Sequence, residues 1–160
     1  MATNPKAAAP AAVISMVIAF STPFEGEAHV AYPDIARPEI WTICMGETKG
    51  VHKGMRMNHQ QCVASMAKRV PDYLGPVDRM MPGLSDNSRI AYTDFAWNEG
   101  VARLTYRTGG RKGTSIVDLE RAGRHPEACN RLLKFNTANR VVLPGLDHRR
   151  KAERELCLRT

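Results

Sequence analysis

The stretch EGEAHVAYPDIARPEIWTICMGET, residues 25–48, lies between an apolar N-terminal segment and a longer chain that is rich in helix signals. Its β-branched and aromatic residues favour strands, and Pro33 and Pro38 mark turns or strand edges. We therefore expect a short β-hairpin region over residues 29–48.

On both sides of this region the sequence predicts helices. Asn58-x-x-Gln61 and Ser115-x-x-Asp118 resemble capping boxes, and Gly123 is a natural helix stop. The expected helices span residues 11–24, 59–70, 86–98, 116–123, 126–136 and 146–158. One small sheet near the N-terminus followed by helices only indicates an α+β fold with segregated elements.

The composition fits one compact, basic domain. The chain has 160 residues, of which 43% are hydrophobic and 24% charged, so it can form a core and is not compositionally disordered. A net charge of +7 favours a polyanionic partner, such as nucleic acid, an acidic membrane or an anionic cell wall. The basic residues form no run of five or six, which argues against nucleic acid.

The cysteines and histidines give no metal-site spacing that we recognise. No C-x-x-C pair occurs, so we expect no zinc site. Four cysteines are compatible with two disulfides, for which the sequence allows three pairings, or with four buried thiols. They are Cys44, Cys62, Cys129 and Cys157.

The N-terminal segment, residues 1–24, contains an uncharged stretch from Ala7 to Phe24. It is near the lower length limit of a membrane span, is rich in alanine and contains two prolines. Three interpretations remain open: a weak, releasable signal anchor, an uncleaved export signal, or the first core helix. Residues 25–160 would then form the catalytic domain.

Two carboxyl groups and a hydroxyl in the hairpin region suggest a specific chemistry. Glycoside hydrolysis needs one protonated and one ionised carboxyl group at the scissile bond. Glu25 ends an apolar helix beside Phe24, where partial burial favours the neutral acid. Asp34 lies in a polar turn, where the ionised carboxylate costs less free energy. Thr42, in the neighbouring strand, is placed to orient the attacking water.

Several ordered motifs together resemble the phage-type lysozymes, which include the T-even phage lysozyme and the lambdoid phage endolysins. The resemblance covers residues 24–157. Its motifs are Glu-Gly, Tyr-x-Asp and Trp-Thr-Ile-Cys-x-Gly-x-Thr in the hairpin region, Phe95-Ala96-Trp97-Asn98-x-Gly100, Ala128-Cys129-Asn130, and Gly145-Leu146-x-x-Arg149-Arg150-x-x-Glu153.

The resemblance implies roles for individual residues. Glu25 matches the family's general acid, Asp34 its second carboxylate and Thr42 the threonine that positions water. Asn98 and Gly100 match substrate-binding positions that line the cleft. An arginine of the last helix, either Arg149 or Arg150, is expected to pair with Glu25.

The same resemblance implies a two-lobe lysozyme-like fold with a small N-terminal β region and a larger helical lobe. It implies an endolysin, a muramidase that cleaves the β-1,4 bond between N-acetylmuramic acid and N-acetylglucosamine with inversion, without cofactor or metal, as a monomer. Such a protein is made in the cytoplasm of the infected cell and acts in the periplasm. The alternatives are a lytic transglycosylase and a non-catalytic wall-binding module.

Further expectations concern the remaining charged and cysteine residues. The resemblance implies the pairs Cys44–Cys62 and Cys129–Cys157. The final helix predicts a solvated basic face, with contact to an inner- or outer-membrane surface or to anionic wall as the alternative.

Two features depart from the family pattern. Asp34 and Thr42 are eight residues apart where six are expected, so their separation in space is open. Glu47 stands where relatives often carry histidine, which predicts the loss of a structural ion pair.

Overall fold

The computed structural model describes residues 11–34 and 37–159. It opens with helix α1 (Ala11–Glu25), strand β1 (Ala28–Pro33) and strand β2 (Trp41–Cys44). The later elements are α2 (His59–Arg69), α3 (Pro71–Met80), α4 (Asp86–Glu99), the 3₁₀ helices η1 (Val101–Thr105) and η2 (Gly110–Lys112), α5 (Ile116–Arg121), α6 (His125–Arg131), η3 (Leu132–Lys134), β3 (Thr137–Ala138), β4 (Val141–Val142) and α7 (Pro144–Cys157). The expected α+β class is confirmed.

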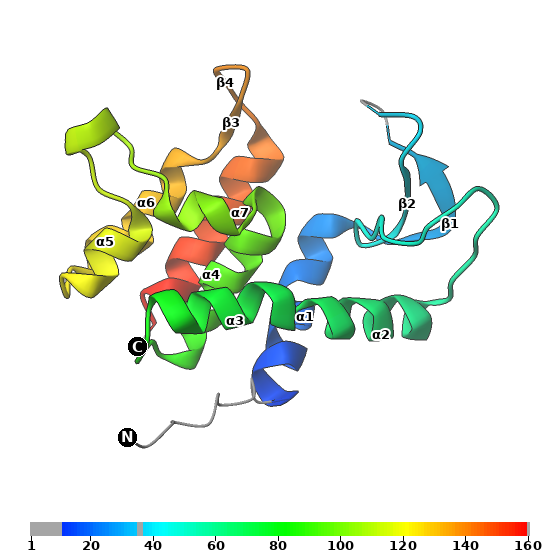
Figure 1. Ribbon diagram of the computed structural model, residues 1–160, viewed down its shortest axis with the longest axis horizontal. Helices are drawn as coiled ribbons and strands as arrows, with labels where there is room; N and C mark the ends of the chain where they lie inside the picture. Colours follow the sequence, from blue (N-terminus) through cyan, green and yellow to red (C-terminus); the bar gives the residue numbers. More distant parts are fainter. Residues whose placement is uncertain (1–10, 35–36, 160) are drawn as a thin grey trace, which may run out of the picture.

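The molecule has two lobes, each with its own apolar core (Figure 1). The small lobe contains α1, the β1–β2 hairpin and α2, and the large lobe contains α4 to α7. Helix α3 joins them, because Leu74 packs into the small-lobe core whereas Val77 and Met81 pack into the large-lobe core. In the same way, α4 gives Ile90 to one core and Ala91 to the other.

Helix α1 belongs to the core of the small lobe. Val13, Val17 and Ser21 repeat every four residues, and all three are buried where α1 packs against α2 and α4. Of the interpretations open for the N-terminal segment, the core helix is the one that the described residues adopt; residues 1–10 lie outside them. Among the helices that the structure describes, none is both long and apolar enough to cross a membrane.

Both predicted capping boxes are present. Asn58 accepts a hydrogen bond from the backbone of Gln61 at 2.9 Å, and the Gln61 side chain accepts one from the backbone of Asn58 at 2.8 Å. Ser115 and Asp118 make the same reciprocal pair at the start of α5. Each box satisfies backbone N–H groups that the first helical turn leaves without a partner.

The sequence analysis missed α3. Pro71, Gly75 and Pro76 resemble helix breakers, but Pro71 occupies the first turn, where a helix does not need its N–H. Pro76 removes one hydrogen bond inside the helix. Burial of Leu74 and Val77 on the inner face compensates for that loss.

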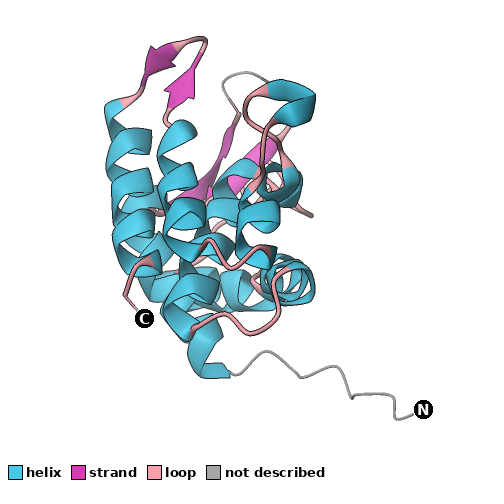
Figure 2. Ribbon diagram, turned by 90° about the vertical axis from the view of Figure 1, so that its left-hand side faces the viewer, coloured by secondary structure: helices cyan, strands magenta, loops and turns pink. Residues whose placement is uncertain are grey.

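The expectation of helices only after the first hairpin is wrong. The predicted helix over residues 126–136 ends at Arg131, continues as η3, and is followed by the β3–β4 hairpin. Asn139 and Arg140 form its two-residue turn with φ values of 49° and 65°. Two positive φ values are typical of a type I′ turn, and the pair Asn-Arg lacks the glycine that usually signals one. Figure 2 shows one hairpin, β3–β4, at the top of the molecule, above the helices.

Candidate active site

Glu25 is the last residue of α1 and lies where the two lobes meet. Its side chain is 16% exposed, and Arg149 Nη1 of α7 lies 2.6 Å from Glu25 Oε1. The structure therefore selects Arg149 over Arg150 as the partner of Glu25. The two atoms lie within ion-pair distance but do not have the geometry of a hydrogen bond.

Asp94 of α4 holds Arg149 in place. Arg149 Nε and Nη2 donate to the two carboxylate oxygens of Asp94 at 2.9 and 2.8 Å, and Ser21 of α1 donates to the same carboxylate at 2.5 Å. Asp94 is fully buried. This bidentate contact leaves Nη1 directed at Glu25. Sequence reasoning missed Asp94, whose only signal is an acidic residue among the apolar residues of the predicted helix over 86–98.

The expectation that the arginines of the last helix form a solvated face is wrong for Arg149 and Arg150, which are both buried. Arg150 Nη1 donates to both oxygens of buried Glu153 at 2.9 and 2.8 Å, and Arg150 Nη2 donates to Asn98 Oδ1. Burial raises the pKa of Glu153, and the Arg150 guanidinium opposes that rise. These arginines are therefore unavailable to a membrane or wall surface.

The register of the first hairpin settles the wide spacing between Asp34 and Thr42. Tyr32 pairs with Thr42 and Pro33 with Trp41, and the same antiparallel register places Asp34 opposite Ile40. The hydrogen bond from Asp34 N to Ile40 O, 2.8 Å long, agrees with this placement. Residues that face each other across a hairpin share a face, as do residues two apart along a strand. Asp34 therefore lies just beyond the end of β1, close to the strand that carries Thr42, and its Oδ1 accepts a hydrogen bond from Arg37 N at 2.8 Å.

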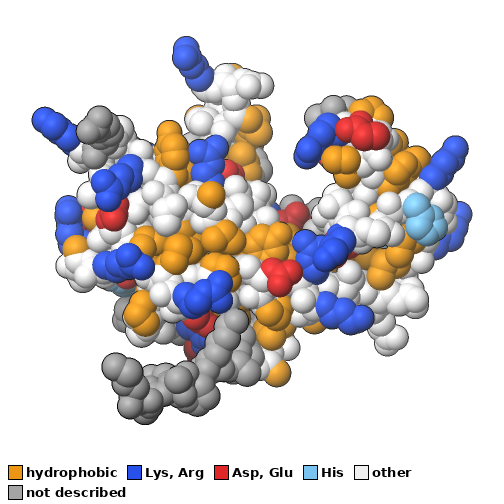
Figure 3. Space-filling view, viewed as in Figure 1, with side chains coloured by type: hydrophobic (Ala, Val, Ile, Leu, Met, Phe, Trp, Pro, Cys, Tyr) orange, Lys and Arg blue, Asp and Glu red, His pale blue; other side chains and the backbone are white. Residues whose placement is uncertain are grey.

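The turn after β2 brings this hairpin to Glu25. A Cβ atom added to Gly46 would lie 3.9 Å from Glu25 Oε2, and Gly46 has a φ of 89°. Thr42, four residues earlier, is 6% exposed. Glu25 thus contacts the hairpin on one side and α7 on the other. Figure 3 shows the surface hollowed between the two lobes, with acidic atoms on the floor of the hollow.

Asn98 and Gly100 lie at the end of α4, in the large lobe. Asn98 Oδ1 is bound by Arg150, so the side chain is held toward α7. Gly100 ends the helix with a φ of 91°, which favours glycine, and no atom lies within 4 Å of a Cβ built on it.

The structure joins Cys44 to Cys62 and Cys129 to Cys157, the pairing that the resemblance implies. The first disulfide ties the end of β2 to α2, close to Thr42. The second ties α6 to the end of α7, in the large lobe.

Glu47 forms an ion pair and a hydrogen bond with side chains of α2. Its carboxylate lies 2.6 Å from Arg69 Nη1 of α2 and accepts a hydrogen bond from Ser65. Glu47 thus makes an ion pair of its own, with a basic residue on the neighbouring helix.

The family model for phage lysozyme matches residues 22–153. The SAR-endolysin of Escherichia phage P1 is 36% identical over 125 residues, which cover 74% of this chain and 68% of that protein.

Two crystal structures of the P1 phage endolysin Lyz match the fold. The active form gives a TM-score of 0.76 at 30% identity, covering 94% of each chain. The secreted inactive form gives 0.56 at 28% identity, covering 98% of this chain and 96% of that chain. The fold described above is thus more similar to the active form. The chain belongs to the phage lysozyme family, the glycoside hydrolases that act on bacterial peptidoglycan.

Proposed function

We propose that this phage lysozyme is a muramidase that hydrolyses the β-1,4 bond between N-acetylmuramic acid and N-acetylglucosamine, with Glu25 as general acid. The observation that carries the proposal is the position of Glu25. Its largely buried carboxyl group lies where α1, the turn after β2 and α7 meet, and an anchored arginine holds it.

Arg149 orients the acid in this proposal. Its positive charge is already matched by Asp94 through two hydrogen bonds. The guanidinium therefore does not require an ionised Glu25 as its counterion. Glu25 donates its proton to the leaving glycosidic oxygen, and Arg149 then stabilises the carboxylate that remains.

Asp34 and Thr42 act on the opposite side of the sugar. The Asp34 carboxylate stabilises the positive charge that develops at the anomeric carbon, while the Thr42 hydroxyl holds the attacking water. Their positions at the same end of the β1–β2 hairpin support this pairing of roles. Attack from the face opposite the leaving group inverts the anomeric configuration. Asn98 and Gly100 bind the glycan from the large lobe.

The test compares Glu25→Gln with Glu39→Gln, which removes an exposed carboxyl group from the hairpin turn. We expect Glu25→Gln to slow the clearing of permeabilised cells at least about 100-fold, the lower range of a general acid's contribution, with an unchanged melting temperature. Glu39→Gln should behave as wild type. Activity of Glu25→Gln within about twofold of wild type would refute the role of Glu25.

Product analysis tests the reaction itself. A hydrolase adds one water molecule to each cleaved bond, whereas a transglycosylase forms an anhydro sugar without adding water. Proton NMR of the first-formed product reports inversion as the α anomer. Thr42→Ser should retain most of the activity and Thr42→Ala should lose it, because only serine preserves the hydroxyl group. Anhydro products would show that the protein is a lytic transglycosylase and would overturn the proposed hydrolysis.

We also propose that the protein acts in the periplasm, as a monomer, after transient anchoring of residues 1–24 in the inner membrane, while residues 25–160 carry the catalytic groups. The name of the P1 relative, SAR-endolysin, and the apolar run from Ala7 to Phe24 support it. Val17 is fully buried in the fold, so α1 cannot lie in lipid and in the core at the same time. Fractionation of expressing cells should find an inactive membrane-bound pool and an active soluble one.

A further inference from the structure

The two adjacent arginines of α7 have different partners. Arg149 lies beside Glu25, whereas Arg150 Nη2 donates to Oδ1 of Asn98, near the end of α4. Successive residues of a helix are turned about 100° around its axis, so neighbouring side chains leave the helix in different directions. One turn of α7 therefore reaches both the candidate acid and a candidate substrate-binding residue.

The guanidinium of Arg150 is anchored on two sides. Its Nη1 donates to both carboxylate oxygens of Glu153 at 2.9 and 2.8 Å, and its Cζ lies over the ring of Phe95, 4.9 Å from the ring centre. Arg150 and Glu153 are both fully buried. Because the guanidinium is planar, these contacts also fix the place from which Nη2 donates.

The contact with Arg150 decides which end of the Asn98 amide faces the protein. A guanidinium has donors only, so the amide atom that it contacts must be the carbonyl oxygen. The amide nitrogen Nδ2 then points the other way, and Asn98 is an exposed residue. Among the residues that the structure describes, no acceptor takes a hydrogen bond from Nδ2. The group that Asn98 offers to a ligand is therefore its NH₂ donor.

We propose that Arg150 is a positioning residue for substrate binding: it holds the carbonyl oxygen of Asn98 and so directs Nδ2 at an acceptor oxygen of the glycan, such as an acetamido carbonyl. This inference rests on the proposed function, in which Asn98 binds the glycan. A carbonyl oxygen accepts hydrogen bonds but does not donate them, so it complements an NH₂ group. Without Arg150, the amide could turn over and present its own carbonyl, which repels such an oxygen.

Steady-state kinetics on a soluble glycan fragment tests this role. Asn98→Ala should raise KM about tenfold, because it removes the donor. Arg150→Lys keeps a positive charge beside Glu153 but loses the planar fork, so it should raise KM about threefold to tenfold, since the amide must then be ordered on binding. In both variants kcat should stay within about twofold of wild type, as expected when binding alone is weakened. A purely structural role of Arg150 would lower the melting temperature without this change in KM.

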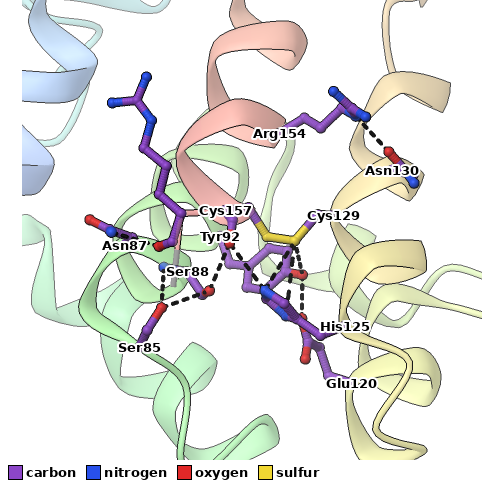
Figure 4. The surroundings of a disulfide bond; sticks show 11 residues. Ser85, Asn87, Ser88, Tyr92, Glu120, His125, Cys129, Asn130, Arg154 and Cys157 are labelled. Carbon is purple, nitrogen blue, oxygen red and sulfur yellow. Dashed lines mark hydrogen bonds and ion pairs between the residues drawn. A yellow bond between two sulfur atoms is a disulfide. The ribbon is translucent and has the colours of Figure 1, made fainter.

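Arg154 gives a matched control on the same helix. Its Nε donates to Oδ1 of Asn130 at 2.5 Å, on the side of α7 where the Cys129–Cys157 disulfide lies (Figure 4). Arg154→Lys therefore removes the same kind of arginine–asparagine contact outside the candidate active site, and it should leave both KM and kcat as in wild type.

A double variant separates a role through Asn98 from an independent one. If Arg150 acts through Asn98, Asn98→Ala/Arg150→Lys should have the same KM as Asn98→Ala alone. A wild-type KM for Arg150→Lys, or two effects on KM that multiply in the double variant, would overturn this inference and leave the proposed function intact.

A surface variant covers the case in which Arg150→Lys does not fold. The carboxylate of Asn98→Asp can still accept from Arg150 but has no N–H group, so its KM should rise at least as far as that of Asn98→Ala. A wild-type KM for Asn98→Asp would overturn the inference and would also remove Asn98 from the binding site. The hydrolysis itself is judged separately, by Glu25→Gln and by the products.

Discussion

Arg149 shows how a single side chain joins the parts of the site. It is 3% exposed, and it contacts Asp94 of α4, Glu25 of α1 and, at 3.5 Å, Glu153 of its own helix. Burying a guanidinium is costly unless its hydrogen bonds and charge are matched. The two bonds to Asp94 provide this match, so Nη1 can hold Glu25 at a fixed place.

Glu153 leads to a prediction about pH. Burial raises its folded pKa above the unfolded value of about 4.3, so between the two values the folded chain binds more protons. The stability that Glu153 contributes is therefore fully present below about pH 4.3 and is lost as the pH rises through the folded pKa. Glu153→Gln removes this titration. The unfolding free energy of wild type, relative to Glu153→Gln, should fall as the pH rises above about 4.3 and through the folded pKa.

Urea unfolding at several pH values measures this difference. Glu155→Gln is the matched control, because Glu155 is on the same helix but its side chain is 69% exposed. Its effect on the free energy of unfolding should be small at every pH. A wild-type advantage over Glu153→Gln that grows with rising pH would show that the two arginines outweigh burial.

Among the elements, the loop before α5 depends on one glycine. A Cβ atom added to Gly113 would collide with the carbonyl oxygen of Thr108, which is backbone and cannot rotate away. Thr108 and Thr114 form an isolated β-bridge across this loop, and Arg131 of α6 donates hydrogen bonds to both side chains. Gly113→Ala should therefore destabilise the protein by about 1–3 kcal/mol.

Gly145→Ala is the matched control in the first turn of α7. Nothing lies within 4 Å of a Cβ built there, and alanine favours a helix more than glycine by about 1 kcal/mol. Thermal unfolding should thus give a lower melting temperature for Gly113→Ala and an equal or higher one for Gly145→Ala. Equal melting temperatures for the two variants would show that the loop adapts and that the glycine is not required.

The elements also differ in how far the sequence could predict them. Capping boxes at Asn58 and Ser115 fixed the starts of α2 and α5, because the capping contacts lie within four residues. Helix α3 and the β3–β4 hairpin were missed, since Leu74 and Val77 stabilise α3 through long-range burial and the turn at Asn139 lacks glycine. Such elements depend on contacts that a local pattern does not contain.

At the scale of the whole molecule, charge should govern the encounter with the wall. The net charge is +7, and Figure 3 shows lysine and arginine dispersed over the face in view rather than gathered in one patch. Raising the ionic strength from about 0.01 M to about 0.1 M shortens the Debye length from about 30 Å to about 10 Å. The rate of clearing of permeabilised cells should fall several-fold over this range.

A short, soluble glycan fragment of the wall, which carries few charges, serves as the control substrate. Its cleavage rate should change little with salt, because no long-range attraction brings it to the enzyme. A clearing rate that does not depend on salt would show that electrostatic attraction does not govern the encounter with the wall. An equal loss of rate on both substrates would instead locate the salt effect in the active site.

The sequence by itself predicted the α+β class, the two capping boxes and, through the resemblance, the candidate set Glu25, Asp34 and Thr42. Motifs carry this information because they fix local backbone geometry and residue type. Only the tertiary structure decided that Arg149 rather than Arg150 holds Glu25, that Asp94 anchors it, and that Cys157 meets His125. These partners lie on helices far apart in the chain, so only the packing of α1, α4, α6 and α7 brings their charged and hydrogen-bonding groups together.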